Sequence, residues 1–154
     1  MENLLKFYIN GEWVAPLSDA TMPVLNPATE KQIGTVALGN EADVDRAVAA
    51  ASTAFEEFSQ TSKDGRLALL RKVRAITEAR IEELAQAMRM EMGAPITMSR
   101  DVQADAAVGH LDGFITALEE LEERLKLANG DIMVREPIGV CGLITPWNWP
   151  VNQV

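Results

Sequence analysis

The sequence holds one cysteine, Cys141, and one histidine, His110. A single cysteine cannot form a disulfide within the chain, so nothing indicates an oxidising compartment. With one histidine and one cysteine, neither a multi-histidine nor a mixed zinc site can be assembled within the chain. Both glycine-rich phosphate motifs, GxGxxG and GxxxxGKS/T, are missing as well. We therefore expect no metal site here and no complete nucleotide site.

Basic residues are scarce, because 14 Lys and Arg stand against 23 Asp and Glu, which gives a net charge of −9. Such a surface repels phosphate backbones and anionic lipids, so neither nucleic acid nor a membrane surface is an expected partner. No apolar run approaches the ~18–20 residues of a membrane span. The start MENLLKFYINGEW also lacks the basic and long apolar regions of a signal peptide. A hydrophobic fraction of 47% over 154 residues is typical of a cytoplasmic globular domain.

Turn signals predict an N-terminal β segment. Asn10-Gly11 tolerates positive φ at both positions and lies between the strand-like runs of FYINGEWV, which favours a hairpin. Asn26-Pro27 opens a second turn, after which residues 33–36 resume a short strand.

Three helices are expected next. Asn40 caps the first, with Asp43 three positions on as a short-armed capping box. The second is a single long helix that Gly93 and Pro95 end. The third runs from about residue 97 toward residue 126. Each helix has apolar side chains on one face. In the first they are Val44, Ala47, Val48, Ala51, Phe55 and Phe58, and in the second Leu69, Leu70, Val73, Ile76, Leu84, Ala87 and Met88. In the third they are Val108, Leu111, Ile115, Leu118, Leu121 and Leu125.

The pattern changes near residue 130. IMVREP indicates a strand closed by Pro137, and IGVCGLIT indicates a strand buried on both faces. Short strands, three helices and a buried strand predict the front of an α/β protein with a mostly parallel sheet. A buried strand needs neighbours on both edges, so we expect the sheet to be incomplete and the chain end to be a truncation.

Asn148 is the most interesting polar residue, because it follows the predicted strand and lies between Pro146 and Pro150. Ligands of open α/β sheets bind just beyond the carboxyl ends of strands, where a fixed amide can donate to a developing oxyanion. On spacing alone, a helix cap or an Asx turn is the more frequent role of such an asparagine. Cys141 lies inside the apolar run, so we expect it to be a buried packing residue and not a nucleophile. His110 is expected to be a structural or surface residue, since nothing identifies a partner for general-base catalysis.

REPIGVCGLITPWNWP closely resembles a segment of the aldehyde dehydrogenase superfamily, in which a strand leads into Pro-Trp-Asn-aromatic-Pro. FYINGEWV, VLNPATEKQIGTV, DVDRAVAAASTAF and EMGAP agree with the family in the same order. The resemblance covers essentially the whole chain and corresponds to the first third or so of a subunit. It implies the N-terminal hairpin and helices, plus the first strand, of a Rossmann-like cofactor domain.

The resemblance also implies roles for residues. Asn148 matches the asparagine whose amide joins the oxyanion hole, and Ile144, Thr145, Pro146 and Trp147 match the strand end that lines the nicotinamide cleft. It implies three segments: residues 1–128 of the cofactor domain, a β arm for oligomerisation at 129–138, and the truncated first strand and turn at 139–154. For the whole enzyme, the resemblance implies NAD or NADP as cofactor, an aldehyde as substrate and assembly into a homodimer or homotetramer.

The catalytic cysteine, the general-base glutamate and the dinucleotide-binding residues lie further downstream in this family. We therefore expect the whole enzyme to oxidise an aldehyde to the acid, and these 154 residues alone to be inactive. The alternative hypotheses are a non-catalytic interaction protein that docks on a partner subunit and a truncated gene product without a role of its own.

Overall fold

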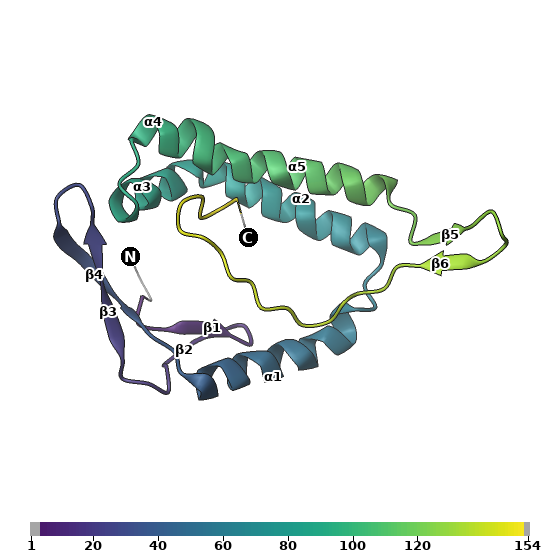
Figure 1. Ribbon diagram of the computed structural model, residues 1–154, viewed down its shortest axis with the longest axis horizontal. Helices are drawn as coiled ribbons and strands as arrows, with labels where there is room; N and C mark the ends of the chain where they lie inside the picture. Colours follow the sequence, from purple (N-terminus) through teal and green to yellow (C-terminus); the bar gives the residue numbers. More distant parts are fainter. Residues whose placement is uncertain (1–3, 153–154) are drawn as a thin grey trace.

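The computed structural model describes residues 4–152, so the outermost residues of the expected segments 1–128 and 139–154 lie outside it. Helices α2 and α5 lie side by side, α1 runs along the opposite edge, and the chain after residue 136 passes between them (Figure 1). The elements are β1 (Phe7–Ile9), β2 (Glu12–Val14), β3 (Thr21–Asn26), β4 (Lys31–Ala37), α1 (Glu41–Phe58), α2 (Lys63–Ala79), α3 (Ile81–Glu91), α4 (Ile96–Met98), η1 (Ser99–Ala104), α5 (Asp105–Glu120), β5 (Arg124–Lys126) and β6 (Ile132–Val134). None of the helices within residues 4–152 has the length and apolar character needed to cross a membrane.

The N-terminal β segment is confirmed as two antiparallel hairpins. Strands β1 and β2 pair across Asn10 and Gly11, whose φ angles of 53° and 81° are those a tight two-residue turn requires. Strands β3 and β4 pair across the turn predicted at Asn26, whose Oδ1 accepts from the amides of Ala28 at 2.9 Å and Thr29 at 3.2 Å. An Asx turn therefore sets the second hairpin.

The predicted capping box of α1 is also confirmed. Asn40 Oδ1 accepts from the Asp43 amide at 3.0 Å, and Asp43 Oδ2 accepts from the Asn40 amide at 3.2 Å. Asp43 is buried and its Oδ1 also accepts from the Leu17 amide, which fastens the start of α1 to the preceding loop. The predicted apolar face, by contrast, is exposed: Val44 and Val48 are 59% and 47% exposed, and none of residues 4–152 covers them.

The expected second helix is wrong in one respect, because Arg80, with φ −113° and ψ 15°, divides it into α2 and α3. Neither glycine nor proline marks this break. It lets α3 turn so that Ala85 and Met88 pack against Ala104 of η1, and this tertiary contact overrides local helix propensity. The predicted stripe is confirmed at Met88, which is buried, but Leu69, Val73 and Ile76 of α2 are exposed. Leu67, which was not in the predicted stripe, is buried instead.

Gly93 ends α3 as predicted, in the left-handed conformation with φ 77°. A Cβ at this position would lie 2.5 Å from Cγ of Pro27, so the glycine also permits close approach of the β3–β4 turn. Gly93 thus joins the β segment to the helical layer.

The third helix is continuous from α4 through the π-helical η1 to α5, but it ends at Glu120 and not near residue 126. Leu121, with φ −64° and ψ 122°, leaves the helical conformation. Lys63 stabilises this end, since its Nζ donates to the carbonyl oxygens of Glu119 at 2.6 Å and Leu121 at 3.0 Å. These are carbonyls that a helix end leaves without partners. Leu125, expected in the helical stripe, lies instead in β5, which pairs with β6 in a hairpin that projects from the body (Figure 1).

The strand expected over residues 138–145 does not form, and Cys141 is exposed, not buried. Ile138 and Ile144 are 92% and 99% exposed. The physical reason is that no strand within residues 4–152 lies beside this segment, so its backbone donors and acceptors have no ladder to join.

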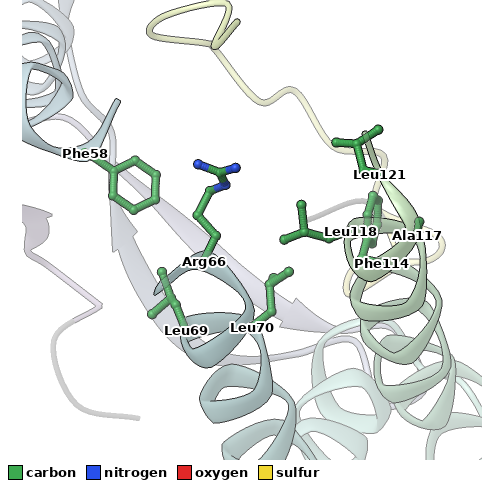
Figure 2. Close-up of a pocket in the computed structure, with 8 residues that line it drawn as sticks. All are labelled: Phe58, Arg66, Leu69, Leu70, Phe114, Ala117, Leu118 and Leu121. Atoms are coloured by element: carbon green, nitrogen blue, oxygen red, sulfur yellow. The ribbon is translucent and has the colours of Figure 1, made fainter. Parts of the chain in front are cut away.

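An apolar hollow of about 390 Å³ opens between the end of α1, α2 and α5 (Figure 2). Its walls are Phe58, Arg66, Leu69, Leu70, Phe114, Ala117, Leu118 and Leu121. Phe114 remains 66% exposed, so the two packed helices still present an uncovered apolar face.

An ion pair holds α3 to η1. Arg100 donates from Nε to Glu82 Oε2 at 2.7 Å and from Nη2 to Oε1 at 3.3 Å, and Gln86 donates to the same carboxylate. The hydrogen bond from Arg100, then that from Gln86, lowers the pKa of Glu82 to about 2.

We predict that Gly93→Ala destabilises the protein by about 1–2 kcal/mol from left-handed strain, with a further loss from contact with Pro27. Gly109→Ala is the matched control: a Cβ there meets nothing within 4 Å, and alanine should stabilise α5 by up to ~1 kcal/mol. Urea unfolding of both variants measures the difference. Equal stability of the two would contradict this account of Gly93.

The Glu82–Arg100 pair predicts a pH window. Because the pKa of Glu82 is depressed on folding, its contribution is present above the unfolded value of about 4.3 and is lost as pH falls through about 2. Wild type should therefore exceed Glu82→Gln in stability near neutral pH and converge with it in acid. Arg100→Gln removes the other partner and should show the same window. Thermal unfolding across this range tests it, and a gap that persists below the lower pH would refute it.

Candidate functional site

The turn at residues 147–152 is docked although the segment before it is unpaired. Val151 packs against the buried cluster of Ala85, Met88 and Ala104, where α3 meets η1. The Asn152 amide donates to the Trp149 carbonyl at 3.1 Å and closes the turn. The helical layer therefore fixes the place where the predicted site residues lie.

Two polar side chains hold the same turn from the third helix. Gln103 of η1, only 1% exposed, donates from Nε2 to the carbonyl oxygen of Asn148 at 3.0 Å. His110 of α5 is exposed, as expected for a surface residue, and its Nε2 hydrogen bonds to Asn152 Oδ1.

Asn148 itself lies at the surface of the described part of the chain. The residue is exposed, and its side-chain amide makes no hydrogen bond with any other residue of the range 4–152. In this part of the chain the amide therefore closes no Asx turn and caps no helix. A main chain held at its carbonyl, with the side-chain donor left free, is an arrangement suited to binding an incoming oxygen atom.

The four residues predicted to line a cofactor cleft precede Asn148 as an uncovered stretch. Ile144 is 99% exposed and Trp147 is 81% exposed, and Thr145 and Pro146 are exposed between them. Trp147 also borders an open hollow of about 620 Å³ against α3 and the β3–β4 turn. This stretch is thus left uncovered by the other described residues directly before Asn148.

Cys141 lacks the surroundings of an activated thiol. Its one hydrogen bond among the described residues is a long contact of 3.8 Å from Sγ to the Gly139 carbonyl, and no cation pairs with it there. Likewise, no three side chains of His, Cys, Asp or Glu gather within residues 4–152 to hold a metal ion.

Gln103 is the residue that the sequence analysis missed. The apolar stripe read from Val108 gives no signal for it, because η1 is π-helical and changes which side chains face inward. The sequence did offer one signal: Gln103 lies among the small residues Ser99, Ala104 and Ala107, which favour close packing. Burying an amide there is unfavourable unless it forms a hydrogen bond, so a specific partner could have been suspected.

A model of the Aldehyde dehydrogenase family matches residues 13–154. A 3-succinoylsemialdehyde-pyridine dehydrogenase from a Pseudomonas species is 47% identical over 160 residues, covering 100% of this chain and 32% of the relative. The chain thus spans about a third of the length of the curated relatives that it matches.

Solved structures agree. A mutant of aldehyde dehydrogenase C from Pseudomonas syringae, in complex with NAD⁺ and octanal, superposes with a TM-score of 0.94 at 46% identity, over 98% of this chain and 31% of that one. An aldehyde dehydrogenase from Bartonella henselae gives a TM-score of 0.93 at 40% identity, over 96% and 32%. The mixed α/β class and the correspondence to the N-terminal part of such structures are confirmed.

Proposed function

The chain belongs to the aldehyde dehydrogenase family, and from this membership we propose that it forms the N-terminal part of a cytoplasmic enzyme that oxidises an aldehyde to the carboxylic acid with NAD or NADP. The observation that carries the proposal is the Asn148 amide, displayed without a partner among residues 4–152 on a turn docked to the helical layer. NAD⁺ is the nucleotide in several similar structures, including the complex with octanal.

Asn148 acts on the oxygen of the substrate. When a nucleophile adds to an aldehyde, the carbonyl oxygen becomes an anion, and a donor already aimed at that position stabilises it without reorganisation. The Asn148 side-chain Nδ2 is the donor that this chain supplies. A nicotinamide held beside Ile144, Thr145, Pro146 and Trp147 would supply the hydride acceptor that aldehyde oxidation requires.

The cleft for the nicotinamide dinucleotide is lined by four residues that precede Asn148: Ile144, Thr145, Pro146 and Trp147. Their exposure supports the proposal, because a wall that no other described side chain covers remains open to a flat ring. Pro146 restricts the backbone, so this wall changes little when a ligand binds.

The nucleophile comes from outside these residues. Cys141, the only cysteine in the sequence, hydrogen bonds to no cation or base within residues 4–152, so we assign it no catalytic role. Residues 1–154 by themselves are then inactive. The β arm at residues 129–138, which includes β6, contacts a second subunit in a homodimer or homotetramer.

A second proposal is that the chain acts as a non-catalytic protein that docks on a partner subunit. The uncovered apolar hollow between α2 and α5 favours it, because exposed apolar patches of this kind mark contact surfaces. The intact mass of the native protein separates the two: about three times 16.8 kDa supports the enzyme, and 16.8 kDa supports the docking protein.

We predict that Asn148→Ala in the native enzyme lowers kcat by roughly a hundredfold or more, because one oxyanion donor is removed. Asn148→Asp should lose at least as much, since a carboxylate repels the developing anion. Asn10→Gly in the β1–β2 turn, where φ is positive, is the matched control and should leave kcat unchanged. Steady-state kinetics with an aldehyde and NAD⁺ gives the result, and full activity of Asn148→Ala would rule out this role.

A further inference from the structure

Gln103 touches the main chain of the residue that carries the proposed oxyanion donor. Its Nε2 donates to the Asn148 carbonyl oxygen at 3.0 Å across 45 positions of sequence. The other attachments of the turn, through Val151 and Asn152, lie beyond Asn148. Among the described residues, Gln103 alone forms a hydrogen bond with Asn148 itself.

The buried amide of Gln103 is only half satisfied among the described residues. Gln103 is 1% exposed, and its Oε1 is buried without a hydrogen-bond partner in the described part of the chain. A buried acceptor without a partner opposes folding, and an apolar side chain of the same shape removes that penalty. A side chain that breaks this rule in a well-packed place points to function.

The hydrogen bond from Gln103 restrains the backbone of Asn148. Trp149 precedes Pro150 and Thr145 precedes Pro146, so both positions are restricted to extended backbone. The orientation of Asn148 then depends largely on its own backbone angles. Holding its carbonyl oxygen fixes the peptide plane that follows and so restrains the backbone from which the Asn148 side chain extends.

We propose that Gln103 is a positioning residue for catalysis: its side-chain amide holds the Asn148 carbonyl so that the Asn148 amide meets the developing oxyanion. This inference rests on the function proposed above. Gln103 touches neither substrate nor cofactor and acts only through Asn148.

The test uses the native protein that carries these residues, with an aldehyde and NAD⁺, and four variants: Gln103→Met, Asn148→Ala, the double variant and Gln86→Met. Gln103→Met keeps the side-chain length but cannot donate. We expect its kcat to fall by up to about a hundredfold, the effect of misplacing a catalytic group by about 1 Å. The thermal midpoint should stay near that of wild type, because removal of the unpaired Oε1 offsets loss of the hydrogen bond to the Asn148 carbonyl. KM for both substrates should also stay near wild type, because Gln103 touches neither of them.

The control Gln86→Met removes a glutamine that hydrogen bonds to Glu82 and Arg89 and makes no hydrogen bond with the turn at residues 147–152, so its kcat should match wild type. The double variant should be no slower than Asn148→Ala alone, since Gln103 has nothing to position once the amide is gone. If Gln103→Met does not fold, Gln103→Asn keeps the amide but shortens the reach, and the same loss of kcat at unchanged KM is expected.

Three results would overturn the inference while leaving the dehydrogenase function intact. They are unchanged kcat in the Gln103 variants, a loss that adds in full to that of Asn148→Ala, or a loss that follows a fall in thermal midpoint. Failure of the proposed function looks different, because wild type itself would then show no aldehyde oxidation, or Asn148→Ala would keep full activity.

Discussion

Packing of Ala85 and Met88 on Ala104, where α3 crosses η1, is the contact on which the candidate site depends. Two of these side chains are alanines with no exposed surface, so the helices approach closely and leave no room for a larger residue. Val151 completes the cluster from the far end of the chain. The position of Asn148 is therefore decided by the helical layer and not by the segment that leads into it.

Features set by a few neighbouring residues were predictable from the sequence. The Asn10-Gly11 turn, the Asn40–Asp43 capping box and the Gly93 helix end each depend on local backbone chemistry, and all are present. The break at Arg80 was not predictable, because its cause is the contact between α3 and η1.

The sequence predicted less of the site than of the turns. The sequence indicated Asn148, but not Gln103, whose side chain bonds to Asn148 across 45 positions. Gln103 lies in the π-helical η1, where the α-helical spacing of 3.6 residues does not predict which side chains are buried. The burial of Cys141 was expected from an apolar run. Burial is a property of neighbours, however, and none within residues 4–152 pairs with residues 138–145. The hydrophobic pattern indicates that a segment can form a buried strand, but whether it does depends on the segments that pack beside it.

The segment between the β5–β6 hairpin and the docked turn is held at both ends. The Arg135 amide donates to the Glu123 carbonyl at 2.9 Å and its Nη1 to the Glu122 carbonyl at 2.6 Å, while Gln103 and Val151 hold the other end. Its end-to-end distance is thus set before any strand lies beside it. Fixing both ends removes part of the chain entropy of this segment, so the loop-closure penalty for pairing with a neighbouring strand would be reduced.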